Sequence, residues 1–145
     1  MKKVASVLIL LFLISCKPSE VNGIVIGETL KVNNTDYLNN NLAKLISNTL
    51  NKDEKSLVKI INFECGGASG CYDLGYVITQ IIYKLGENEF ISIIDNLDKK
   101  ELIGIKELIE VGLEYGDNNY DGKIDNRKFE NEFPTLKKAL LNKNL

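Results

Sequence analysis

The chain has 145 residues, with 18 basic and 20 acidic side chains and a formal net charge of −2. It contains no histidine, so it lacks the usual proton shuttle at neutral pH and the commonest transition-metal ligand. This disfavours many hydrolase and zinc sites. The charges form no basic stripe of the kind that binds nucleic acid. The length allows one domain with a hydrophobic core.

The first sixteen residues have the layout of a secretory leader. Two lysines precede an uncharged apolar run at 4–14, which is shorter than the roughly 20 residues that a membrane-spanning helix needs. The run ends in a small residue and a cysteine, within Leu13-Ile14-Ser15-Cys16. This pattern resembles the signal peptide and lipobox of bacterial lipoproteins. The alternative is an ordinary signal peptide in which the cysteine is incidental.

The lipoprotein resemblance implies where the protein is placed. In that family the lipobox cysteine receives a diacylglyceryl group, the chain is cut before it, and the new amine is acylated, as with palmitate. Carried over, residues 1–15 are the signal peptide and Cys16 is the lipidated residue, which anchors the chain to a membrane of the bacterial cell envelope. Lys17 stands where inner-membrane retention signals place aspartate, so we expect the outer membrane, facing either the periplasm or the exterior.

Residues 16–34 are predicted to hold the lipidated cysteine and a tether. This part contains Pro18, Gly23 and Gly27, and only the stretch 23–27 has the composition of a strand. That stretch fits either a strand lying on the domain or a linker, and the linker is our expectation.

Residues 35–145 are predicted to form an all-α domain of about five to six antiparallel helices, arranged as stacked helical hairpins. Apolar side chains recur at helical spacing throughout, and the connections are short. Capping residues and helix stops mark the expected helices: one from Thr35 to about Leu50, one opened by Asn51–Glu54, one carrying Leu74–Leu85 and ended by Gly86, a short one with Phe90–Leu97, one opened by Asp98–Glu101 and ended by Gly116, and a last one after Pro134.

Cys65 and Cys71 flank a glycine-rich loop. Outside the cytoplasm such a pair forms a disulfide, and closing this loop adds about 2 kcal/mol in the chain-entropy account. A redox-active pair usually has two residues between its cysteines, and a metal site needs more ligands. We therefore predict a structural disulfide.

An acidic segment follows the helix that ends at Gly116. It contains three aspartates and an asparagine at alternate positions, with Gly122 where a chain turns sharply. The spacing resembles the calcium loop of EF-hand and dockerin modules. The resemblance implies five ligand positions, the fourth acting through its backbone carbonyl: Asp117, Asn119, Asp121, Lys123 and Asp125.

The acidic segment departs from that pattern at its twelfth position. Lys128 stands where a bidentate carboxylate belongs, and Glu130 or Glu132 could replace it only in a relaxed loop. A plain turn between helices is the other interpretation, because Asp and Asn make local backbone hydrogen bonds and Gly adopts a left-handed conformation.

The chain shows no nucleophile motif, phosphate-binding loop or catalytic triad, so we do not expect an enzyme. The sequence predicts a lipid-anchored envelope protein whose helical domain binds another protein, as an immunity or an envelope-assembly lipoprotein. The alternative is a structural module that binds calcium through residues 117–125. No cofactor other than calcium is implied.

Overall fold

The computed structural model describes residues 19–118 and 121–143, so the predicted signal peptide and Cys16 lie outside the described residues. Two short strands come first and are followed by helices. The described elements are β1 (Ser19–Val21), β2 (Ile24–Ile26), α2 (Glu28–Val32), α3 (Asp36–Leu50), α4 (Glu54–Ile61), α5 (Ala68–Leu85), α6 (Glu87–Ile93), α7 (Lys99–Tyr115), α8 (Phe129–Glu132) and α9 (Pro134–Asn142). The prediction of a small, mainly helical domain is confirmed, and α2 and α8 are additional to the expected helices.

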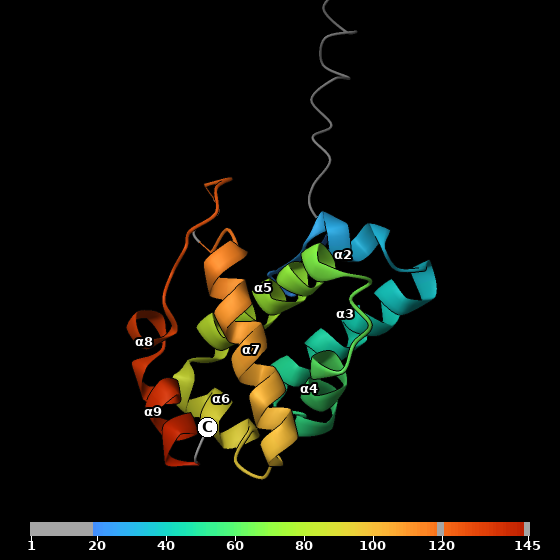
Figure 1. The fold of residues 1–145 in the computed structure, drawn as a ribbon. Coiled ribbons are helices and arrows are strands. Elements are labelled where there is room, and N and C mark those ends of the chain that lie inside the picture. Colours follow the sequence, from blue (N-terminus) through green and yellow to red (C-terminus); the bar gives the residue numbers. More distant parts are fainter. Residues whose placement is uncertain (1–18, 119–120, 144–145) are drawn as a thin grey trace, which may run out of the picture.

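Helix α5 is the centre of the fold. It contacts α7, α2, α6, α3 and β2, and Figure 1 shows α7 crossing it on one side. Its apolar side chains recur at helical spacing, and Val77, Ile78, Ile81 and Ile82 are fully buried. The helix ends at Gly86, whose φ of +84° suits a residue without a side chain. The remaining helices pack on the elements around α5: α4 contacts α3 and α7, α8 contacts α7, and α9 contacts α6.

The crossing of α5 and α7 depends on two glycines. A Cβ atom on Gly75 would lie 2.4 Å from the Leu108 carbonyl oxygen. A Cβ atom on Gly112 would lie 2.2 Å from the Gly75 carbonyl oxygen. The two backbones thus touch at this point, and neither position has room for a larger residue.

The N-terminal segment corrects the predicted tether. β1 pairs with β2 in an antiparallel hairpin in which Val21 faces Ile24. The two residues between them have φ values of +51° and +78°, as in a type I′ Asn-Gly turn. Ile24 is 1% exposed, and Leu30 of α2 is fully buried. From Ser19 onward the tether prediction is wrong, because Ile24, Ile26 and Leu30 belong to the core.

Most predicted helix starts are confirmed. Thr35 caps α3 by accepting a hydrogen bond from the Leu38 amide at 3.3 Å. Asp98 and Glu101 form the expected capping box of α7, with bonds of 2.8 and 3.0 Å. The start of α4 differs, because its cap is Asp53 and not Asn51. Asn51 instead ends α3.

The predicted disulfide between Cys65 and Cys71 is present. It joins the segment after α4 to the first turn of α5, across a loop in which Gly66 has a φ of +72°. A Cβ atom on Gly70 would lie 1.9 Å from the Cys65 carbonyl oxygen, so the loop packs tightly onto the helix start.

Within residues 19–118 and 121–143, no helix combines the length and hydrophobicity that crossing a bilayer requires.

Candidate functional site

The acidic loop after α7 begins with Asp117, which serves as a backbone cap. One carboxylate oxygen of Asp117 accepts a hydrogen bond from the Asp121 amide at 2.9 Å, and the other accepts from the Gly122 amide at 2.8 Å. Gly122 has a φ of +82°, which confirms the expected sharp turn at this glycine. Asp117 therefore closes the turn with the side-chain oxygens that a calcium site would also use.

The Asp121 carboxylate also bonds to a nearby backbone amide. Its Oδ1 accepts a hydrogen bond from the Lys123 amide at 2.9 Å. Asn119 lies outside the described residues, so the structure places neither its side chain nor its backbone.

Asn118, which sequence reasoning did not single out, joins the loop to both long helices. The Thr79 hydroxyl of α5 lies 2.8 Å from Asn118 Oδ1, and the Asn118 amide group donates to the Gly112 carbonyl of α7 at 3.0 Å. The Tyr76 hydroxyl donates to the Asp117 carbonyl at 2.8 Å. Thr79 is fully buried, so this contact is shielded from water.

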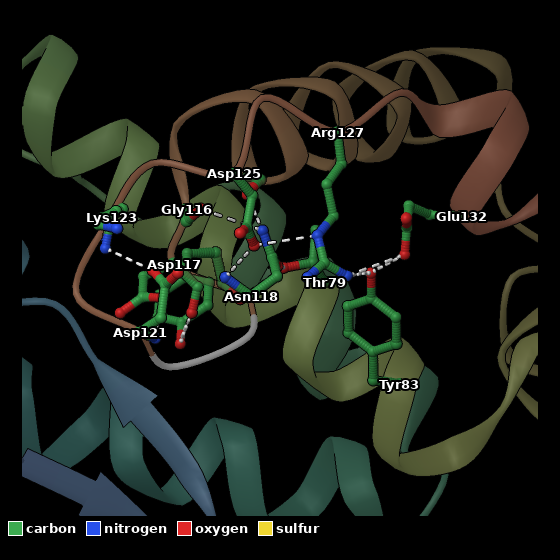
Figure 2. A network of polar contacts seen from close by, with 12 residues as sticks. Thr79, Tyr83, Gly116, Asp117, Asn118, Asp121, Lys123, Asp125, Arg127 and Glu132 are labelled. Carbon is green, nitrogen blue, oxygen red and sulfur yellow. Dashed lines mark hydrogen bonds and ion pairs between the residues drawn. The ribbon is translucent and has the colours of Figure 1, made fainter.

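Asp125 is bonded to Asn118 and Arg127. Its Oδ2 accepts a hydrogen bond from the backbone amide of Asn118 at 2.6 Å and lies 3.0 Å from Arg127 Nε. The Asp125 side chain is 6% exposed. Figure 2 shows it pointing toward Asn118 and Arg127. Its charge is thus already compensated by a guanidinium group.

Arg127 extends the polar network to the end of α8. Its Nη1 lies 3.1 Å from Glu132 Oε2 and 3.3 Å from the Tyr83 hydroxyl of α5. The Tyr83 hydroxyl donates to Glu132 at 2.5 Å. Burial, together with this bond to a carboxylate, raises the pKa of Tyr83 to about 12. The network (Figure 2) therefore fastens the loop to α5 at a second point.

The described residues of the loop do not fit a calcium site well. Asp125 is paired with Arg127, and Glu132, one of the two substitutes for the twelfth ligand, accepts from Arg127 and Tyr83. In the part of the chain that the structure describes, no three Asp, Glu, Cys or His side chains converge as metal ligands do. The arrangement favours the turn between helices, and calcium binding stays a prediction from sequence.

Two further polar side chains, absent from the sequence predictions, hold the N-terminal segment on α5. Gln80 is 4% exposed; it accepts from the Val25 amide at 2.7 Å and donates to the Val25 carbonyl at 2.9 Å. Asp73 accepts from the Leu30 amide at 2.9 Å and so caps α2. A glutamine inside an apolar helical stripe was the available signal for the first of these contacts.

The surface has a hollow of about 420 Å³ between the hairpin, α2 and α3. Its lining mixes apolar and polar side chains, including Val21, Lys31, Asp36 and Asn39. These residues do not form a nucleophile–base pair of the kind that catalysis needs.

Comparisons with known protein families, with curated proteins and with solved structures find no match.

Proposed function

We propose that this protein is a lipid-anchored component of the bacterial cell envelope and that its helical domain acts by binding another protein. The observation that carries the proposal is the position of the lipobox relative to the domain. Cys16 ends the apolar leader, and the first strand begins three residues later, at Ser19. Cleavage before Cys16 would therefore leave every described element of the domain intact and joined to the lipid by a short connection.

The chemistry of the chain supports a binding role and not catalysis. The sequence has no histidine, and the acidic loop uses its described carboxylates to cap backbone amides and to pair with Arg127. Helices α3 and α7 begin at side-chain caps, α5 ends at a glycine, and α5 and α7 touch backbone to backbone. Such a scaffold presents surface side chains in fixed positions, which favours recognition of a protein partner.

Metabolic labelling with a clickable palmitate analogue tests the anchor. We expect the full chain to take up the label and to sediment with membranes, whereas Cys16→Ser loses both properties. The matched control is the double variant Cys65→Ser/Cys71→Ser, which removes the other two thiols and should keep the label. Labelling of Cys16→Ser, or no labelling of the unchanged chain, would overturn the proposal of a lipid anchor.

Cross-linking in living cells tests the binding role. A photo-cross-linking residue at Leu141, which is 56% exposed, should capture one dominant protein from the envelope or the surrounding medium. A secreted toxin as the partner would indicate an immunity lipoprotein, and a resident envelope protein would indicate assembly. Deletion of the gene then separates these roles, because only the immunity role predicts sensitivity to a toxin. Absence of any dominant partner at this and other exposed positions would contradict the binding role.

A further inference from the structure

The covalent connection restricts how the domain sits on its membrane. Only three peptide steps separate Cys16 from Ser19, and even fully extended they span about 11 Å. Ser19 is paired with Ile26 in the hairpin, and α2 begins two residues after Ile26. Because this argument rests on the proposed lipidation of Cys16, it fails if that residue carries no lipid. With the lipid in place, the part of the domain around Ser19 is held close to the bilayer.

A chain of contacts shows which elements share that end of the molecule. The Leu30 amide of α2 bonds to Asp73 near the start of α5 at 2.9 Å. The neighbouring Tyr72 stacks on Tyr115, the last residue of α7, with 4.3 Å between ring centroids. The acidic loop folds back onto the same place through the 3.2 Å bond from the Asp125 amide to the Gly116 carbonyl. Figure 1 shows α2, the end of α7 and the start of the loop gathered at one end.

This end, which we call the anchor end, carries unusually exposed apolar side chains. Val32 of α2 is 71% exposed and Ile124 of the loop is 66% exposed, the highest values among the large apolar residues that the structure describes. Tyr115 is 40% exposed. Tyrosine is enriched at membrane surfaces, because its ring prefers an apolar contact and its hydroxyl prefers water. All three side chains lie on elements that meet at the anchor end.

We propose that the anchor end rests on the lipid headgroup layer of the membrane that holds Cys16, with Val32 and Ile124 inserted at the interface. A few apolar side chains bind a membrane weakly, but a covalent anchor raises their local concentration at its surface. The anchor end also carries acidic and basic residues in mixture, among them Glu28, Lys31, Asp121 and Lys123. The contact therefore depends on apolar burial and not on anionic lipid.

This orientation directs the opposite end of the domain away from the membrane. Helix α7 has 17 residues and so extends about 25 Å from the anchor end. Figure 1 shows α9 far from α2, and α9 packs against α6. Leu141 on α9 is then presented to a partner in solution.

Tryptophan reporters test the orientation, because the chain has no tryptophan of its own. The full lipidated chain is purified with Val32→Trp and reconstituted into phosphatidylcholine vesicles whose acyl chains carry bromine, a contact quencher of indole fluorescence. Ile124→Trp is a second reporter at the anchor end, and it keeps the test valid if the first variant fails to fold by circular dichroism. The matched control is Leu141→Trp, at an exposed apolar position on the opposite end.

We expect a marked loss of emission at positions 32 and 124 and little loss at 141, with the same pattern when anionic lipid is added. Equal quenching at all three positions, or quenching at 141 alone, would overturn the proposed orientation. No quenching at any position in protein that floats with the vesicles would also overturn it and leave the anchor intact. Protein that does not float with the vesicles would instead refute the anchor itself.

Discussion

Two segments outside the long helices are fastened to α5 by different means. The segment from Ser19 to Val32 buries Ile24 and Leu30 in the core, whereas the acidic loop is held by polar contacts such as Asn118 with Thr79 and Arg127 with Glu132. Full burial of an apolar side chain stabilises by about 1.5–3 kcal/mol. A partly exposed ion pair contributes about 0–1 kcal/mol. The N-terminal segment therefore contributes to the stability of the whole domain. The contacts of the acidic loop contribute much less to that stability.

Replacing a core side chain of the N-terminal segment is expected to have the largest effect. Leu30→Ala removes a fully buried side chain and should lower the free energy of unfolding by about 3 kcal/mol. Val32→Ala, in the same helix but 71% exposed, is the control and should change it little. Urea denaturation followed by circular dichroism measures both. Similar small losses in the two variants would show that the segment behaves as a tether.

The next largest loss of stability is expected from removing the two hydrogen bonds between Gln80 and the hairpin. Gln80→Leu leaves the Val25 amide and carbonyl without their partner and should destabilise by about 2 kcal/mol. Hydrogen exchange of the Val25 amide should accelerate more than that of the α7 amides. Asn62→Leu removes a side-chain amide whose bond to Val58 is at the surface, and it should change stability much less. Unchanged exchange at Val25 would mean that apolar burial alone holds the hairpin.

The ion pairs of the loop are expected to contribute least to stability. Glu132→Gln removes the charge that pairs with Arg127, at a site where both side chains are about a quarter exposed (25% and 27%), so the expected loss is about 1 kcal/mol or less. The loss should shrink in high salt, because salt screens exposed charges. Glu130→Gln, at an exposed position of the same helix, is the matched control. A loss as large as that of Leu30→Ala would contradict the distinction between the two segments.

Calcium should have no effect on the melting temperature if the loop is a turn. Asp117 already caps two amides and Asp125 already pairs with Arg127, so an ion would have to displace contacts that exist. Differential scanning calorimetry at millimolar calcium and with chelator measures this. A rise in melting temperature with calcium that Asp121→Ala abolishes would instead establish the calcium site predicted from sequence.

Local signals explain which parts of the fold could be predicted from sequence. Capping residues such as Thr35 and Asp98, and the helix-ending Gly86, act within a few residues of the chain, so their effects are visible in the sequence. The Asn22-Gly23 turn was also a local signal, and its two positive φ values show that it specifies the hairpin. The prediction of a linker used only the composition of residues 16–34 and not this turn signal, so the burial of Ile24 was missed.

The candidate site was only partly predictable for the same reason. The turn at Gly122 follows from local backbone preference. The bond from Tyr83 to Glu132 does not, since these residues of α5 and α8 are 49 positions apart in the sequence and meet only in the folded domain. A spacing pattern identifies candidate ligands, but it cannot show that one of these carboxylates is already paired with a guanidinium group.

The sequence by itself determined the longer helices, the caps of α3 and α7, the disulfide partners and the lipobox pattern, because each depends on residues that are close along the chain. Tertiary structure alone decided that Gly75 and Gly112 meet, that Gln80 bonds to the Val25 backbone, and that Tyr83 bonds to Glu132. These contacts join residues that are distant in sequence. They exist only once α5 is packed, because burial and close backbone approach select the partners.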